Sequence, residues 1–153
     1  MPNWPQLTPQ EQNDLLGEIT LMLVEALPAG WQQLMIDYSV VGKTLDAGIG
    51  VKDASGQFRH WDPPTEVWRL FARLRKGMYQ EDFGVWFGCR LTIDPPSRFH
   101  IQYNREVEPR FPTQPSPEDF LLEERRYPRK REAMPEWYAR KLEAAQAAAT
   151  GAS

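Results

Sequence analysis

Two neighbouring segments, 85–93 and 99–104, constrain the fold most, because apolar residues occupy every second position in both. A period of two is typical of a β-strand with one face buried. Between the segments lies Asp94-Pro95-Pro96-Ser97, a run of turn-forming residues. The sequence therefore predicts an antiparallel hairpin over residues 85–104.

Three earlier segments also predict strands: 34–41, 45–51 and 57–61. In the second of these, apolar residues alternate with Asp46, Gly48 and Gly50, so one face of the strand is nearly free of side chains. Short turns join consecutive strands, which favours an antiparallel sheet.

Helical periodicity precedes and interrupts these strands. Thr8, Pro9 and Glu11 have the spacing of a capping box, which predicts a helix from Pro9 to about Ala26. A second amphipathic pattern runs from Val67 to Met78, with Arg69, Arg73, Arg75 and Lys76 expected mostly in solvent.

The last third predicts a proline-rich loop over 106–117, a short helix over 117–125 and a final helix over 135–148, with residues from about 143 to 153 expected to fray. We therefore predict a single α+β domain spanning residues 1–153. It has an antiparallel sheet of about five strands, the N-terminal and central helices on one face, and C-terminal helices after the sheet.

Composition is consistent with one compact domain, since 41% of the 153 residues are hydrophobic. A single cysteine, Cys89, allows no internal disulfide and fits a reducing compartment. The N-terminus lacks a signal-peptide pattern, and no apolar run approaches the roughly 20 residues that span a bilayer. These features predict a cytoplasmic protein without a membrane partner.

Catalytic and metal-binding groups are sparse. Cys89 alternates with Phe87 and Leu91, which predicts a core thiol rather than a nucleophile paired with His60 or His100. Two histidines and one cysteine give few ligands for a metal, so we expect no metal and no cofactor. Adjacent carboxylates at 81–82 and 123–124 are expected to be solvated, and Gly42-Lys43-Thr44 is expected to form a hairpin turn rather than a phosphate-binding loop.

Two functional alternatives remain open from the residues. The basic run Arg125–Arg131 could bind RNA, although the acidic residues around it favour ion pairing or a protein interface. A small enzyme could use Asp37 beside the glycine-lined strand face as a pocket. The charge of residues 1–66 is −6 and that of residues 67–153 is +3, which argues against a general nucleic-acid binder.

Aromatic residues in polar segments are typical of protein interfaces. The candidates are Phe111, Tyr127, Trp137 and Tyr138, although for Trp137 the favoured role is to dock the C-terminal helices onto the sheet. Tyr127-Pro128-Arg129 could likewise be a structural corner.

The order of parts resembles the YezG-like (DUF600) immunity proteins of bacterial polymorphic toxin systems. An N-terminal helix is followed by Pro28, Trp31 and Leu34, and the strands are followed by an acidic-aromatic pair, a Tyr-Pro-Arg triplet and a closing Pro-x-Trp. These last parts are Asp119, Phe120, Tyr127, Pro128, Arg129, Pro135 and Trp137. The resemblance implies an intracellular protein that is not an enzyme and that neutralises a cognate toxin.

In this family a mycobacterial relative is the immunity factor for an NAD-hydrolysing necrotizing toxin. The implied mechanism is steric, with one inhibitor covering the active site of one toxin domain. We expect the loop from Asn104 to Pro117, stiffened by four prolines, to provide the blocking surface. The candidate toxin-binding residues are Asn104, Arg105, Glu106, Glu108, Arg110, Phe111, Tyr127 and Arg129.

Overall fold

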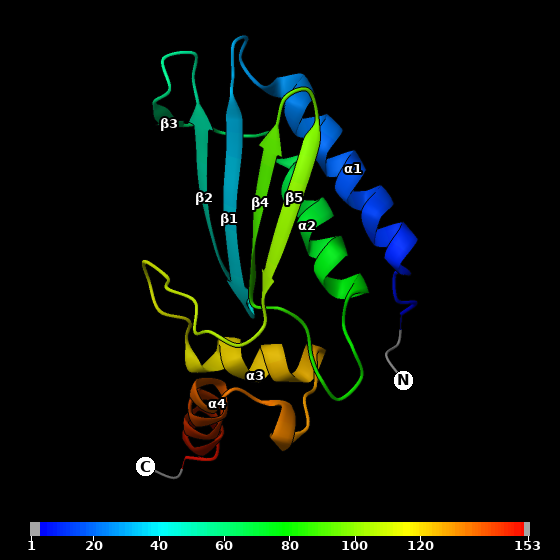
Figure 1. The fold of residues 1–153 in the computed structure, drawn as a ribbon. Helices are drawn as coiled ribbons and strands as arrows, with labels where there is room; N and C mark the ends of the chain where they lie inside the picture. Colours follow the sequence, from blue (N-terminus) through cyan, green and yellow to red (C-terminus); the bar gives the residue numbers. More distant parts are fainter. Residues whose placement is uncertain (1–3, 152–153) are drawn as a thin grey trace.

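The computed structural model describes residues 4–151 and contains a five-stranded antiparallel sheet with the strand order β3-β2-β1-β4-β5 (Figure 1). The strands are β1 (Gln33–Val41), β2 (Thr44–Lys52), β3 (Phe58–His60), β4 (Gly88–Asp94) and β5 (Arg98–Asn104). The helices are α1 (Pro9–Ala26), α2 (Glu66–Gly77), α3 (Pro117–Arg126) and α4 (Glu136–Ala149), with a 3-10 turn, η1, at Arg131–Ala133. The predicted α+β class and element order are confirmed.

β1 forms the centre of the sheet, where Ile36 lies opposite Ile49 of β2 on one side and Leu91 of β4 on the other. Its alternate residues Leu34, Ile36, Tyr38 and Val40 are buried, as their spacing predicts. α1 and α2 cover this face, and Phe71 of α2 stacks on Tyr38 with ring centroids 5.0 Å apart. This first cluster is the main core of the molecule.

The capping box of α1 is present as predicted. The Thr8 hydroxyl accepts a hydrogen bond from the backbone N–H of Glu11, and the Glu11 carboxylate accepts one from the N–H of Thr8. No helix within residues 4–151 is both long and apolar enough to cross a membrane.

A second cluster lies at the end of the sheet, where α3 and α4 pack together (Figure 1). It contains Val41, Phe87, Phe111, Phe120, Trp137, Tyr138, Leu142 and Ala145. The predicted alternation from residue 85 is wrong at its start, since β4 begins at Gly88. The neighbours Trp86 and Phe87 are both fully buried, one in each cluster, so this segment joins the two parts of the core.

Two smaller differences concern the ends of elements. β3 covers three residues of the predicted 57–61, and its side chains are exposed. Residues 143–149, for which we predict fraying, continue α4, and Ala145 is buried in the second cluster. The rest of that tail includes residues 152 and 153, which lie outside the described residues.

Candidate protein-binding surface

The loop that follows β5 is held in shape by the side chain of Asn104. Its Oδ1 accepts hydrogen bonds from the backbone N–H groups of Glu106 and Val107, at 3.3 and 2.9 Å. Its Nδ2 donates to the carbonyl of Val107 at 2.8 Å. Asn104 therefore closes a tight turn that projects Arg105, Glu106 and Val107 from the end of the sheet.

The same turn is fixed to α4. The indole N–H of Trp137 donates to the carbonyl oxygen of Glu106 at 2.7 Å, and Lys141 lies 3.9 Å from the Glu108 carboxylate. Further along the loop, Pro109 and Phe111 are buried, Phe111 in the second cluster. A loop that the sequence predicts to be stiff is thus attached at both ends of its exposed part.

A groove of about 850 Å³ lies beside this turn. Four segments line it: the turn after α2, the loop after β5, η1 with the residues that follow it, and the first turns of α4. The lining residues are Gln80, Phe83, Arg105, Glu106, Glu132, Ala133, Met134, Pro135, Glu136, Trp137 and Arg140. We call it the C-terminal groove.

Two large apolar side chains are exposed at this end of the molecule. Phe83 is 56% exposed at the edge of the C-terminal groove, and Val107 is 70% exposed at the tip of the adjoining turn. The ammonium group of Lys130 lies 4.6 Å from the centre of the Phe83 ring, a cation–π contact. Exposed apolar groups near a stiff loop are typical of surfaces that bind proteins.

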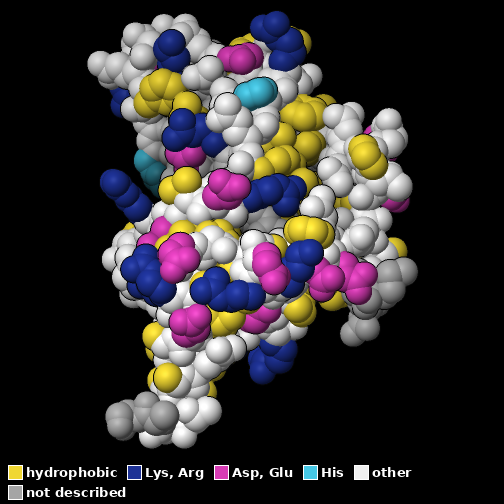
Figure 2. All heavy atoms as spheres, turned by 60° about the horizontal axis from the view of Figure 1, so that its bottom comes forward, with side chains coloured by type: hydrophobic (Ala, Val, Ile, Leu, Met, Phe, Trp, Pro, Cys, Tyr) yellow, Lys and Arg dark blue, Asp and Glu magenta, His cyan; other side chains and the backbone are white. Residues whose placement is uncertain are grey.

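Charge on this end of the molecule is mixed. Figure 2, which brings the α3 and α4 end forward, shows acidic and basic side chains alternating, with apolar side chains between them. The groove follows the same pattern, with Arg105 and Arg140 opposed by Glu106, Glu132 and Glu136. Such a surface can match a partner of complementary pattern, whereas a nucleic-acid site carries a continuous basic stripe.

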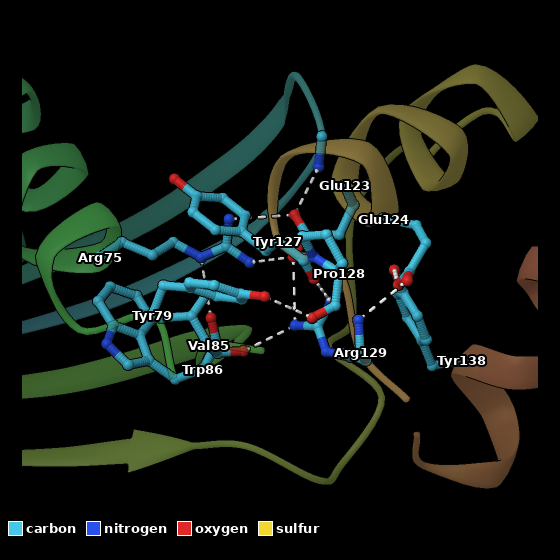
Figure 3. Close-up of polar contacts among 11 residues, drawn as sticks. Arg75, Tyr79, Val85, Trp86, Glu123, Glu124, Tyr127, Pro128, Arg129 and Tyr138 are labelled. Atoms are coloured by element: carbon cyan, nitrogen blue, oxygen red, sulfur yellow. Dashed lines mark hydrogen bonds and ion pairs between the residues drawn. The ribbon is translucent and has the colours of Figure 1, made fainter. Parts of the chain in front are cut away.

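Beneath this surface, Glu123 of α3 lies between two guanidinium groups (Figure 3). Its carboxylate accepts bidentate hydrogen bonds from Arg75 at 3.0 and 2.7 Å and a third from Arg129 at 3.2 Å. Arg75 and Glu123 are 4% and 0% exposed, so the prediction that both are solvated is wrong. The cluster can be buried because each charge meets its opposite and each guanidinium also donates to a backbone carbonyl, of Trp86 or of Val85.

The electrostatics of this cluster follow from its geometry. Burial would raise the pKa of Glu123, but the charges and hydrogen bonds of Arg75, with the charge of Arg129, bring the pKa below its ordinary value. Burial raises the pKa of the neighbouring Glu124, which accepts hydrogen bonds from the N–H of Arg129 and the hydroxyl of Tyr138. Glu123 is thus held ionised, and both carboxylates serve to fix the chain around them.

Tyr127-Pro128-Arg129 forms a structural corner around the same cluster. The hydroxyl of Tyr79 donates to the carbonyl of Pro128 at 2.7 Å, and the guanidinium of Arg75 lies 5.0 Å from the Tyr127 ring centre. Gly84 has φ +80°, and a Cβ there would meet the side chain of Arg129. The structure therefore supports the prediction that Tyr127-Pro128-Arg129 is a structural corner.

This placement changes the candidate contact set. Arg129 and Phe111 are 6% and 8% exposed, so their side chains are internal and the expectation that they contact a partner directly is corrected. Tyr127 is half-buried between Arg75 and Trp4. Of the other predicted residues, Arg105, Glu106, Glu108 and Arg110 are exposed, and Asn104 shapes the loop that carries them.

One residue of the groove, Phe83, is not among the candidates that the sequence predicts. Phe83 lies far from the loop in sequence, and only the turn between α2 and β4 brings it to the groove. The sequence does contain an indication that Phe83 is exposed. Phe83 is the only large apolar residue in Gln80-Glu81-Asp82-Phe83-Gly84, so it has no apolar neighbour in this segment with which to form a buried face.

The remaining chemical candidates are structural. Cys89 is buried, which raises the pKa of its thiol to about 12 and confirms it as a core residue. Asp37 is half-exposed and lines a concave site of about 540 Å³ on the open sheet face, where its carboxylate is paired with Arg90. Within residues 4–151, no three His, Cys, Asp or Glu side chains converge as a metal site would require.

The run Arg125–Arg131 does not form one basic surface. Arg129 is internal, and Arg131 faces Glu143 at 3.7 Å, whereas Arg126 lines a separate pocket with residues of α2. The local ion pairing that the sequence favours over RNA binding is present at two of these residues, Arg129 and Arg131.

No protein-family model matches the chain, and no curated protein matches its sequence.

Proposed function

We propose that this protein is an immunity protein that binds one toxin domain and blocks its active site sterically. The observation that carries the proposal is the fixed turn at residues 104–108 beside the C-terminal groove, with Phe83 and Val107 exposed next to it. The resemblance to the YezG-like proteins supplies the class of partner. The partner would be a toxin domain that acts in the cytoplasm, such as an NAD glycohydrolase. This protein would inhibit it without catalysing a reaction itself.

Rigidity of the turn favours tight binding. A flexible loop loses conformational freedom when a partner orders it, and each immobilised side chain or backbone segment weakens the complex. Here the Asn104 hydrogen bonds and the Trp137–Glu106 hydrogen bond order the turn before any partner arrives. A preformed projection of this kind can enter a catalytic cleft with little further loss of entropy.

The composition of the surface fits the same role. Stable protein interfaces bury roughly 1,600 Å² and combine a few apolar anchors with a polar rim. Phe83 and Val107 would be anchors, and the rim would consist of Arg105, Glu106, Glu108, Arg110 and Arg140, all exposed. The alternating charges would set orientation and reject unrelated proteins.

The test uses toxin domains encoded beside the gene, with NAD glycohydrolase activity assayed first. Titration calorimetry of the purified pair should give a one-to-one complex in the nanomolar range, and a stoichiometric amount of this protein should abolish the toxin's activity. If no neighbouring toxin domain binds or is inhibited, the proposal is wrong.

The location of the interface is tested by the variant Phe83→Asp/Val107→Asp. Both side chains are exposed, so the fold should be retained, while affinity should fall at least a hundredfold because two apolar anchors become charged. Leu21→Asp/Phe58→Asp is the matched control, since both residues are exposed and apolar, lie in α1 and β3, and do not line the groove. Equal affinity for both double variants would place the interface elsewhere.

A further inference from the structure

A second concave site lies on the helical side of the molecule, between α2, the start of the described chain and the end of α3. It has a volume of about 540 Å³ and is lined by Trp4, Arg69, Ala72, Arg73, Lys76, Arg126 and Tyr127. Four of these seven residues are basic and none is acidic. The volume lies within the range of pockets that hold small molecules.

The pocket follows from the spacing of α2. Arg69, Arg73 and Lys76 recur at intervals of four and three, so they project from one side of the helix. Ala72 lies in the same stripe and leaves space between the longer side chains. Arg126, in the last turn of α3, completes the ring of cations from a second element.

The aromatic residues of the pocket are held in place. The indole N–H of Trp4 donates to the carbonyl of Lys76 at 2.8 Å, and the Lys76 ammonium lies 5.1 Å from the Trp4 ring centre. Tyr127 packs edge-on against Trp4 with centroids 6.0 Å apart, and Arg75 contacts it from the core. The wall of the pocket is therefore rigid, whereas its cations are exposed.

The charges of the pocket are poorly compensated by the protein itself. Within residues 4–151, Arg69, Lys76 and Arg126 make no ion pair, while Arg73 also borders a smaller cavity with Glu11, Asp14 and Glu18. Like charges at neighbouring helical positions repel each other. An anion in the pocket would relieve that repulsion, and arginine side chains bind phosphate oxygens with well-defined geometry.

We propose that this pocket binds a small ligand that carries a multiply charged phosphate group, such as a diphosphate. Arg69, Lys76 and Arg126 would bind the phosphate oxygens, with Arg73 as a further donor, and Trp4 and Tyr127 would contact the organic part of the ligand. The site is separate from the C-terminal groove, as the two share no lining residue. Its test is therefore independent of the proposed toxin partner.

The experiment titrates the full-length protein with pyrophosphate, ADP and adenosine, and follows the Trp4 indole resonance by NMR together with calorimetry. Pyrophosphate and ADP should bind saturably and one-to-one, and adenosine should not. Arg69→Gln/Arg126→Gln should weaken binding about tenfold or more, because two charge-assisted hydrogen bonds are lost. Lys43→Gln/Arg98→Gln removes the same charge at exposed positions outside the pocket and should change affinity less than about twofold.

A second variant tests whether binding needs the space in the pocket as well as its positive charge. Ala72→Leu fills the space between the cations and keeps all four of them, so it should weaken ADP binding while α2 retains its stability, since leucine is a good helix former. The proposal is overturned if neither pyrophosphate nor ADP saturates the protein, if adenosine binds as well as ADP, or if the control variant loses as much affinity as the pocket variant. Binding of a long RNA without binding of ADP or pyrophosphate would also overturn it.

Discussion

Glu123 is the residue on which the C-terminal part of the structure depends most directly. It is fully buried, and its carboxylate accepts hydrogen bonds from Arg75, Arg129 and the backbone N–H of Gly42. A buried ion cluster contributes little net stability compared with apolar residues, because desolvation offsets the attraction between the charges. Removing one member is much more costly, since its partners remain buried without compensation.

We therefore expect Glu123→Gln to lower the free energy of unfolding by about 3–5 kcal/mol, because two guanidinium groups lose their counter-charge. Urea denaturation followed by circular dichroism measures this loss. Glu25→Gln, at an exposed position near the end of α1, should change stability by less than about 0.5 kcal/mol. A similar small loss for both variants would show that the buried arginines find other partners.

The lowered pKa of Glu123 predicts how this difference varies with pH. The ordinary value is 4.5, so above that pH the full contribution of the ionised carboxylate is present. As pH falls below 4.5 and toward the folded-state pKa, the unfolded chain binds a proton that the folded protein does not. The difference in the free energy of unfolding between wild type and Glu123→Gln should then decrease, by at most about 1.4 kcal/mol per pH unit. A gap that stays constant between pH 7 and pH 3 would contradict the assignment.

At the scale of elements, the contact between α3 and the β1–β2 turn joins the C-terminal helices to the sheet. Asp119 accepts hydrogen bonds from the N–H of Lys43 at 2.8 Å and from the hydroxyl of Thr44 at 2.7 Å, while also capping α3 through Ser116. Burial opposes ionisation of Asp119, but these hydrogen bonds prevail and its pKa is lowered. The turn predicted from Gly42-Lys43-Thr44 is thus also a docking point.

Gly42 allows that contact, since it has φ +59° and a Cβ there would lie 2.7 Å from the Cα of Asp119. Gly42→Ala should destabilise the protein by about 1–2 kcal/mol through backbone strain and by about 1–3 kcal/mol more through displacement of α3. Gly56→Ala is the matched control, because φ is +85° but the nearest atom, Cε of Lys52, is 3.9 Å away. Thermal unfolding of both variants measures the difference, and equal losses would mean that α3 does not constrain this turn.

At the scale of the whole molecule, two hydrophobic clusters share one chain without a linker between them. Trp86 belongs to the first and Phe87 to the second, and the Arg75–Glu123–Arg129 cluster connects α2 with α3 between them. This construction predicts that the sheet and the C-terminal helices unfold together.

Leu142→Ala, deep in the second cluster, tests this cooperativity. Removing its side chain should cost about 2–5 kcal/mol. Five of the six tryptophans lie in or against the first cluster, so fluorescence reports mainly on the sheet, while circular dichroism at 222 nm reports on all helices. Both signals should shift to the same lower urea midpoint, and Leu21→Ala, at an exposed position of α1, should leave it nearly unchanged. Two separated transitions would show that the clusters fold independently.

The sequence by itself determined the elements and the main core, because these depend on local spacing. The capping box at Thr8 and Glu11 sets the start of α1, and alternation in β1 identifies the residues that face α1 and α2. It also indicated the stiff loop, since Asn104 and the prolines act within a few residues of themselves.

Only the tertiary structure decided which charges are internal and where the candidate surface lies. Arg75, Glu123 and Arg129 have ordinary surface patterns in sequence, and they become buried because α2 and the distant segment 123–129 bring opposite charges together. Phe83 and Arg105 meet at one groove for the same reason. Burial of a charge depends on its partners in space, and a local pattern carries no information about partners some 50 residues away.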